Sequence, residues 1–442
     1  MTTPVDLAPG FRMTEIGPFP EEWEVVPFEH ATTITRGVSW RKGDESPSGT
    51  PIIGIPNVGT DGRVRLDIRY RVNKRIARER LLSPGDILLV GSSGSVHNVG
   101  RAAVVPDHPF SALGFASFLA KADPREGVCD RSFLLHLVRS PLVDFAVCAR
   151  RAADGKYNLQ VQQLRQQLVP LPPLPEQRSI AAVLDTVRRV TEATEKVIGA
   201  TRELKRSLTQ YLFTYGPVPH DQADQVPLKE TEIGPMPEGW DVVSLGDVAR
   251  IRYGLGQPPE LDEGGVPMIR ATNIKRGRIV REGLIRLKKE AIPASRDPFL
   301  RTGDIIVVRS GAYTGDVAAV TPEWEGAVAG YDLVVSPEEC LHPSFCSQFL
   351  LGTSAQRYFR GQRDRSAQPH LNAQQLSGTE VPLPPPDEQR EIADTLSATD
   401  ATAASNGARR SALGVVFTAL LHRLMTGQVR VNDLDLPSEE KT

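Results

Sequence analysis

The chain has 442 residues, of which 40% are hydrophobic, 24% are charged and 6% are aromatic. This length and composition suit a globular protein of two or three domains with ordinary buried cores. The formal net charge is −2 and the isoelectric point is about 6.5, which excludes a bulk electrostatic attraction to polyanions. Any surface for nucleic acid must therefore be local.

Missing sequence patterns exclude further classes of protein. The stretch MTTPVDLAPGFRMTEIG lacks a signal-peptide pattern, and no window approaches the roughly 18 apolar residues of a membrane span. We therefore expect a cytoplasmic protein without membrane contact. The cysteines at Cys129, Cys148, Cys340 and Cys346 form no CxxC pair, which favours reduced core residues over a disulfide framework or a zinc site.

One set of motifs occurs twice, in the same order, along nearly the whole chain. TEIGPFPEEWEVV begins at Thr14 and returns as TEIGPMPEGWDVV at Thr231. Likewise PIIGIPNV returns as PMIRATNI, LSPGDILLVGSSG as LRTGDIIVVRSG, and NLQVQQL as HLNAQQL, which in both copies precedes a proline block. Two copies are too few for a solenoid and indicate two homologous modules.

Within each module the expected elements are short strands followed by a helix. In chain order, the first copy predicts strands at 25–35, 51–58, 86–90, 101–105 and 115–121 and a helix at 131–150. The second copy predicts strands at 240–253, 267–273, 304–308, 316–320 and 331–335 and a helix at 343–360. Strands first and a helix late indicate an α+β fold for each domain.

A long helix is expected after each proline block, VPLPPLPEQ at Val169 and VPLPPPDEQ at Val381. Prolines stop a helix from starting earlier, and Glu176 and Gln177 suit a first helical turn beside its positive end. Because the block precedes both helices, a stiff spacer is favoured over a PxxP ligand for a partner's aromatic groove.

A three-four spacing runs along both helices and predicts a heptad seam with apolar ends and a polar middle. If an approximate two-fold axis relates the modules, the two helices pair antiparallel; the alternative is that each packs alone on its own domain. The apolar seam residues are Ile180, Leu184, Val187, Leu208 and Leu212 in the first helix and Ile392, Leu396, Leu413, Phe417, Leu420 and Leu424 in the second.

The repeat predicts a division of the chain into five parts. Residues 1–168 form the first domain, 169–215 the first proline block and helix, 216–380 the second domain, 381–428 the second block and helix, and 429–442 a tail. The second helix has ATAASNGARR at its centre, where Asn406 and Gly407 weaken the seam.

No catalytic or cofactor motif is visible. The chain has no GxxxxGK[ST] loop, no HExxH, no GxSxG and no Asn-Pro-Pro-Tyr or Asp-Pro-Pro-Tyr box, and the glycine-rich GSSGSVHNVG at Gly91 lacks the Lys-Ser/Thr of a phosphate loop. Lone histidines such as His97 and His370 are more typical of hydrogen-bonding residues than of ligands. We therefore predict no catalytic residue, no metal and no cofactor on this chain.

The chain resembles specificity subunits of Type I restriction-modification enzymes. The resemblance is carried by the paired helices and by three repeated motifs, which are IGPFPEEWEVV and IGPMPEGWDVV, PGDILLV and TGDIIVV, and LPPLPEQ and LPPPDEQ. The resemblance extends from about Thr14 to Gly427. It implies two target-recognition domains, each reading one half of a split, asymmetric double-stranded DNA target. The long helices would set the gap between the halves and dock two methyltransferase subunits.

The same resemblance implies that catalysis lies elsewhere in a complex. Restriction and translocation subunits would cut DNA, and S-adenosylmethionine, ATP and Mg would act on other subunits. This chain would be the non-catalytic reader. An enzyme with unfamiliar motifs and a tandem-domain scaffold for peptide or polymer ligands remain as alternatives, the second because the isoelectric point is about 6.5.

Base edges and phosphates are contacted chiefly by Arg, Lys, Asn and Gln side chains. Such residues cluster at 62–75 and 150–160 in the first copy and at 270–278, 309–315 and 360–372 in the second. The candidate DNA-binding residues are Asn57, Arg63, Arg65, Lys74, Arg75, Lys156, Tyr157 and Asn158 in the first copy and Arg270, Asn273, Lys275, Arg276, Arg309, Tyr313, Arg363, Arg365 and His370 in the second.

Overall fold

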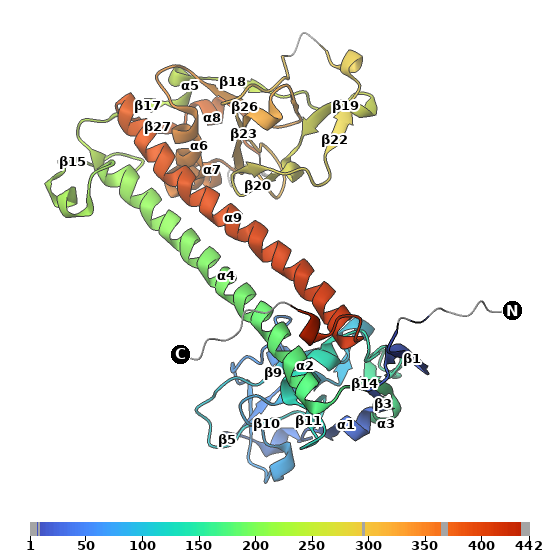
Figure 1. The fold of residues 1–442 in the computed structure, drawn as a ribbon. Helices are drawn as coiled ribbons and strands as arrows, with labels where there is room; N and C mark the ends of the chain where they lie inside the picture. The colour runs from blue at the N-terminus through green and yellow to red at the C-terminus, as the bar shows by residue number, and fades with distance from the viewer. Residues whose placement is uncertain (1–6, 8, 294–296, 364–369, 435–442) are drawn as a thin grey trace. The chain divides into compact units, whose positions relative to one another are not determined.

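The computed structural model describes residues 7, 9–293, 297–363 and 370–434 (Figure 1). Contacts divide the chain into two compact units, of which unit 1 comprises Met1–Thr194 with Arg409–Thr442 and unit 2 comprises Glu195–Ala408. Each unit holds one α+β domain and half of each long helix, α4 (Leu174–Tyr215) and α9 (Pro386–Met425). The division of the chain into five parts, which follows from the sequence repeat, stays a prediction.

The central sheet of unit 1 has the strand order β4-β11-β7-β9, and all its pairs are antiparallel. These strands are β4 (Thr32–Arg36), β11 (Leu119–Pro124), β7 (Ile87–Val90) and β9 (Ala102–Val104). A second sheet joins β10 (Gly114–Phe115), β5 (Glu45–Ile53) and β6 (Tyr70–Val72). The remaining strands and α-helices are β1 (Phe11–Thr14), β2 (Gly17–Pro20), β3 (Glu24–Pro27), α1 (Phe28–Ala31), β8 (Ser92–Ser93), α2 (Arg131–Arg139), β12 (Ala149–Arg151), β13 (Tyr157–Leu159), α3 (Val161–Gln166) and β14 (Leu168–Leu171).

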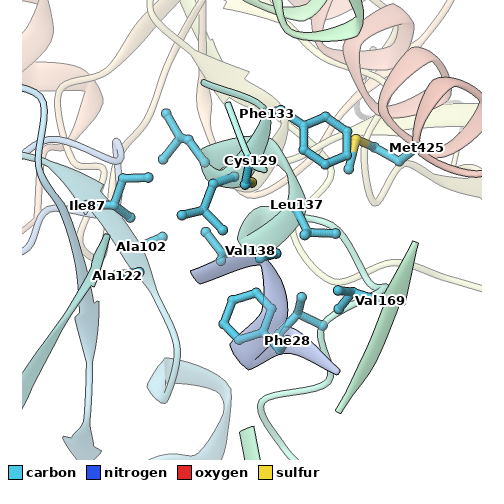
Figure 2. Packing of buried hydrophobic residues seen from close by; sticks show 14 of the residues in the cluster. Phe28, Ile87, Ala102, Ala122, Cys129, Phe133, Leu137, Val138, Val169 and Met425 are labelled. Atoms are coloured by element: carbon cyan, nitrogen blue, oxygen red, sulfur yellow. The ribbon is translucent and has the colours of Figure 1, made fainter. Parts of the chain in front are cut away.

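Both faces of this central sheet are buried, which explains why β7 is a continuous apolar run. One face, with Ile87, Ala102 and Ala122, packs on α2, and Figure 2 shows Phe133 of that helix next to Met425 of α9. The opposite face packs on the β5 region in a separate apolar cluster that contains Leu88. The end of α9 is thus part of the core of unit 1.

Unit 2 repeats this arrangement with the central order β18-β26-β23-β24 and the second sheet β22-β19-β25. The central strands are β18 (Ala249–Tyr253), β26 (Leu333–Pro337), β23 (Ile305–Val307) and β24 (Val317–Ala319). The other strands and α-helices are β15 (Leu228–Lys229), β16 (Met236–Pro237), β17 (Asp241–Ser244), α5 (Leu245–Val248), β19 (Leu261–Ile269), β20 (Ile274–Lys275), β21 (Arg278–Ile279), β22 (Ile285–Leu287), β25 (Val328–Ala329), α6 (Pro343–Leu351), α7 (Thr353–Arg363), α8 (Ala373–Ser377) and β27 (Glu380–Leu383).

The proline blocks and helix starts fasten each long helix to the preceding domain. In unit 1, β14 pairs with β3, and in unit 2, β27 pairs with β17. The indole Nε1 of Trp23 donates to Glu176 at 2.9 Å, and that of Trp240 donates to Glu388 at 2.9 Å. Glu176 and Glu388, which follow the prolines, therefore do more than begin a helix. Each binds the tryptophan of the repeated motif at the start of its own domain.

The neighbouring glutamines complete the attachment. Gln177 donates to the carbonyls of Val128 and Pro172 and accepts the Asp130 N–H. Its counterpart Gln389 makes the same three kinds of bond, with the carbonyls of Cys340 and Pro384 and the N–H of His342. Both amides are 1% exposed, so each helix is locked to the loop before α2 or α6.

Within each unit the helix halves run antiparallel. In unit 1, Glu176 of α4 pairs with Arg430, just beyond α9, while His136 contacts both Asp185 of α4 and Phe417 of α9.

In unit 2, Lys205 of α4 pairs with Asp400 at 2.7 Å, and Gly216 just beyond α4 lies against Glu388. The predicted α+β class with antiparallel helices is confirmed.

All the predicted seam residues are buried or half-buried. Both alternatives are partly right, because each helix end packs on a domain and on the other helix. Ile180, Leu184, Leu212, Ile392, Leu396 and Leu424 are buried, and Val187, Leu208, Leu413, Phe417 and Leu420 are half-buried.

Two predicted strands are wrong in the same way in both copies. The stretches 25–35 and 240–253 each contain a four-residue helix, α1 or α5, between two strands. In α1, Phe28 and Ala31 are both buried because positions three apart lie on one side of a helical turn. An alternating pattern continued through such a turn resembles one long strand.

The predicted helices are also shorter than expected. Helix α2 begins at the Asp130 cap but ends at Arg139, because Ser140 is extended and Pro141 follows. The helix expected at 343–360 is two helices, α6 and α7, separated by Gly352. Three cysteines are buried as expected, whereas Cys340 is exposed; burial raises the pKa of Cys129 and Cys346 to about 12.

Candidate nucleic-acid interface

In unit 2, loops from separate parts of the sequence meet at one edge of the central sheet. Strand β18 ends at Tyr253, Arg309 follows β23, and Tyr331 precedes β26. The Arg309 guanidinium carbon lies 4.8 Å from the centroid of the Tyr253 ring and 4.4 Å from that of Tyr331. These residues line an open cavity of about 580 Å³, and both tyrosines are about half exposed.

His370 and Asp332 hold this cluster in place. Arg309 Nη2 lies 2.9 Å from His370 Nε2, and burial together with the Arg309 charge lowers the pKa of His370. The imidazole is therefore neutral and accepts the bond, since a guanidinium can only donate. The Asp332 carboxylate accepts the Arg309 backbone N–H, and burial raises the pKa of Asp332 to about 6.

Other predicted residues of unit 2 lie near the same edge. The Arg270 side chain packs against Gly330, beside Tyr331, and donates to the Gly283 carbonyl. Tyr313 is 51% exposed in the turn after Arg309. Arg363 is the last residue of α7, and Arg365 lies outside the described residues.

The equivalent edge in unit 1 carries different side chains. Strand pairing places Arg36, Gly91 and Phe118 where unit 2 has Tyr253, Arg309 and Tyr331. Phe118 is 55% exposed. The frame of the two edges is the same, but their chemistry differs.

A basic hairpin lies at this edge of unit 1. Strands β12 and β13 pair with each other, and β13 also pairs with β8. The hairpin carries the predicted Lys156, Tyr157 and Asn158; Lys156 is exposed and lies 3.4 Å from Asp154, and Arg151 lies over the Tyr157 ring at 6.0 Å. The predicted cluster at 150–160 is thus brought together on the surface.

Asn57 and Asn273 are corrections to the predicted set, because the structure buries them. They are 2% and 0% exposed. Asn57 Oδ1 accepts the Gly54 N–H, and its amide donates to the carbonyls of Arg65 and Asp67. Asn273 holds its turn in the same way. With their hydrogen-bonding groups engaged inside the domain, these side chains are not available to base edges.

The remaining predicted cations are exposed, and most of them already have partners. Arg63 pairs with Glu192 of α4, Arg65 donates to the Pro56 carbonyl and Lys74 to the Ser39 carbonyl. Lys275 pairs with Glu282 at 2.6 Å. Arg75 and Arg276 are exposed, and Arg276 has a positive φ of 52°. Arg63 in particular is held against the long helix α4 by Glu192.

Tyr253, Tyr331 and Phe118 were not predicted, and Arg151 was predicted only as a member of the cluster at 150–160. Strand pairing brings Tyr253 and Tyr331 to the edge of unit 2 and Phe118 to the edge of unit 1. The repeat could have indicated these residues. They lie where the two copies differ in sequence, next to strands in which the two copies agree.

The long helices also expose apolar residues. Leu204 of α4 is 53% exposed and Val416 of α9 is 46% exposed. Leu204 precedes the seam residue Leu212 by as many residues as Val416 precedes the seam residue Leu424, so Leu204 and Val416 occupy equivalent positions of the repeat. Val197 and Val415 are exposed beside them. Each unit thus carries one such apolar patch on a helix.

Within the described ranges, no three His, Cys, Asp or Glu side chains gather as they would around a metal ion. Over the same part of the chain, no helix is both long and apolar enough to cross a membrane.

The fold is that of Type I restriction-modification specificity subunits. A crystal structure of the S subunit of a Type I system from M. genitalium matches with a TM-score of 0.60 at 14% identity, covering 91% of this chain and 96% of that one. A second structure, from work on complex assembly and conformational transition of the Type I system, matches with a TM-score of 0.53 at 17% identity, covering 93% and 99%.

Sequence comparisons agree with the fold. A family model described as the Type I restriction modification DNA specificity domain matches residues 237–413. The putative MjaX specificity subunit of Methanocaldococcus jannaschii is 27% identical, with 95% of this chain and 97% of that protein covered. The EcoKI specificity subunit of Escherichia coli is 23% identical, with 96% and 94% covered. The chain is thus similar to Type I specificity subunits over nearly its whole length, and residues 237–413 match their DNA specificity domain.

Proposed function

We propose that this chain is the DNA-reading subunit of a Type I complex and recognises a bipartite, asymmetric double-stranded sequence. The observation that carries the proposal is the pair of equivalent sheet edges with different side chains. Two identical readers would favour a symmetric site, whereas Arg309 with two tyrosines and the basic β12–β13 hairpin offer different groups to bases and phosphates. One half of the target would be read by each unit.

The candidate contacts follow from this proposal. In unit 1 they are Lys156, Tyr157 and Asn158, with Arg65, Lys74 and Arg75 as exposed cations that can hold phosphates. In unit 2 they are Arg270, Arg309, Tyr313 and His370, with Lys275 and Arg276 in the phosphate role; Arg363 and Arg365 stay in the predicted set on sequence alone.

The helices are proposed to dock two methyltransferase subunits and to set the number of unread bases between the halves. Leu204 and Val416 are apolar, exposed and equivalent, which supports one docking site on each unit. Methyltransferases docked there would in turn recruit restriction and translocation subunits. Catalysis, with S-adenosylmethionine, ATP and Mg, would belong to those partners.

The test is the methylation pattern of a host genome with and without this gene. A split motif that disappears with the gene supports the proposal, and an unchanged methylome contradicts it. Labelled S-adenosylmethionine and magnesium added to the purified chain with DNA test the enzyme alternative. A salt-dependent shift of duplex DNA by the purified chain separates DNA reading from a protein-only scaffold.

Docking is tested separately with Leu204→Glu and Val416→Glu. Each change places a charge in one apolar patch, so each should remove about one of two bound methyltransferase subunits, and the double variant both. Leu261→Glu is the matched control, since Leu261 is 60% exposed but lies on β19. Analytical ultracentrifugation gives the stoichiometry, and full binding by the double variant would contradict the docking surface.

A further inference from the structure

Arg309 is held more firmly than a surface arginine usually is. Its guanidinium contacts the rings of Tyr253 and Tyr331, and its backbone N–H donates to Asp332 while its carbonyl accepts the Leu371 N–H. Its Nη2 donates to His370. A flexible arginine loses rotamer freedom when it binds, and this one is already ordered before any ligand arrives.

The charge of Arg309 is nevertheless not neutralised. Among the residues that the structure describes, no carboxylate oxygen lies within 4.0 Å of its guanidinium nitrogens. Of its five N–H donors, His370 takes one, and Nε is buried without a partner. Donors therefore remain on Nη1 and Nη2, next to the open cavity of about 580 Å³.

We infer that Arg309 reads a guanine in the half-site of unit 2, an inference that rests on the proposed function. A guanidinium of fixed plane offers two parallel N–H groups, which match O6 and N7 of guanine in the major groove. Tyr253, Tyr331 and His370 are positioning residues, since they orient the group that touches the base. Unit 1 has Gly91 at the equivalent position, so this reading is confined to one half of the target.

A phosphate contact is the rival role for the same side chain. Phosphate binding requires positive charge but no fixed guanidinium plane, and lysine serves it well. Guanine reading by a fork requires the plane, so Arg309→Lys and Arg309→Gln separate the two roles. Glutamine keeps a planar group, but its preferred bidentate partner is adenine.

The experiment measures the methylated motif made in cells by the full complex that carries Arg309→Gln or Arg309→Lys. In both variants the preference of the complex for G·C over other base pairs should fall roughly ten- to a hundredfold at one position of one half-site. In the Gln variant the preference at that position should shift toward A·T. The other half-site and the gap should stay unchanged. Arg250→Gln is the control, because Arg250 is an exposed arginine of β18 that pairs with Asp297.

Competition between duplexes in which each G·C pair is replaced in turn by A·T provides a second readout with the purified complex. An unchanged motif in the Lys variant, or a uniform loss of affinity with a weaker salt dependence, would overturn guanine reading in favour of phosphate binding. A unit 2 half-site made only of A·T pairs would overturn it as well. A wild-type complex that methylates no split motif would instead refute the proposed function.

Discussion

The two units keep the same attachment between domain and helix but differ at the sheet edge. Trp23 with Glu176 and Trp240 with Glu388 have the same 2.9 Å bond, whereas Gly91 in one unit stands where Arg309 stands in the other. The bonds that attach each long helix to its domain are the same in both copies, and groups at the edge are different. The comparison teaches that the shared attachment marks structure, while the difference at the edge marks the candidate interface.

The units also differ in how they neutralise a buried acid. Asp304 pairs with Arg252 of β18 at 2.8 Å, whereas Asp86 has Arg131 at 2.8 Å and Lys121 of β11 at 3.7 Å. Lys121 faces Thr35 across its strand pair, and Arg252 faces Val334 in the equivalent pair. The buried cation has therefore changed strands while staying beside the same acid.

The largest expected effect comes from removing that acid. Asp304→Ala leaves Arg252, 9% exposed, without its carboxylate and should destabilise unit 2 by about 3–5 kcal/mol. Asp86→Ala should destabilise unit 1 by less, because Lys121 keeps its salt bridge to Asp123 at 3.3 Å. Hydrogen exchange of peptides from β23 and β7 during a urea titration measures the two costs.

A matched exchange sharpens this prediction. Thr35→Arg combined with Lys121→Val copies the arrangement of unit 2 into unit 1 and should retain more stability than Lys121→Val alone. Equal losses for both variants would show that the cation cannot change strands.

The second effect is a pH dependence of unit 2 that comes from Asp332. Burial raises the pKa of Asp332 from 3.8 to about 6, so folded unit 2 binds a proton more tightly than the unfolded chain. Its stability should fall as pH rises from about 3.8 to about 6, by up to about 3 kcal/mol in total, and Asp332→Asn should remove that fall. Leu119 occupies the equivalent position of unit 1. Hydrogen exchange at several pH values checks this; the same pH slope in wild type and variant would refute it.

The third effect should be equal in the two units. Gln177→Leu and Gln389→Leu each remove three bonds between a helix start and a domain, and each should cost about 2 kcal/mol. Chemical denaturation of the two variants gives the comparison. A large cost in one unit and none in the other would show that the shared attachment is not equivalent.

The smallest effect distinguishes the two acids that bind the tryptophans. Glu176 also accepts two bonds from Arg430, whereas Glu388 has no Arg or Lys partner among the residues described. Glu176→Gln should therefore cost about 1 kcal/mol more than Glu388→Gln. The difference should shrink in high salt, and a thermal unfolding series at two ionic strengths measures it.

Much of the fold was predictable because the repeat and the helix seam are patterns in sequence. Strands such as β7 and β23 follow a Gly-Asp turn with an apolar run, and Ile180, Leu184, Ile392 and Leu396 are buried as the seam requires. The short helices α1 and α5 were missed, because a single buried helical turn has too few residues to show a period.

The candidate site was predictable only in part. The clusters at 150–160 and around Arg309 were found because basic residues are visible in sequence. Asn57 and Asn273 belong to a residue type that can contact base edges, but both copies use this asparagine to hold a buried turn. The tyrosines around Arg309 come from strands far apart in sequence, so only strand pairing places them together.

The most direct test of two different readers on one frame is an exchange of residues 14–168 for the matching segment of a related specificity subunit. The exchange replaces the edge of unit 1 and leaves Arg309 with its neighbours in place. Methylome sequencing should show one half of the recognised sequence changed, with the other half and the gap between them unchanged. A change in both halves would contradict the account.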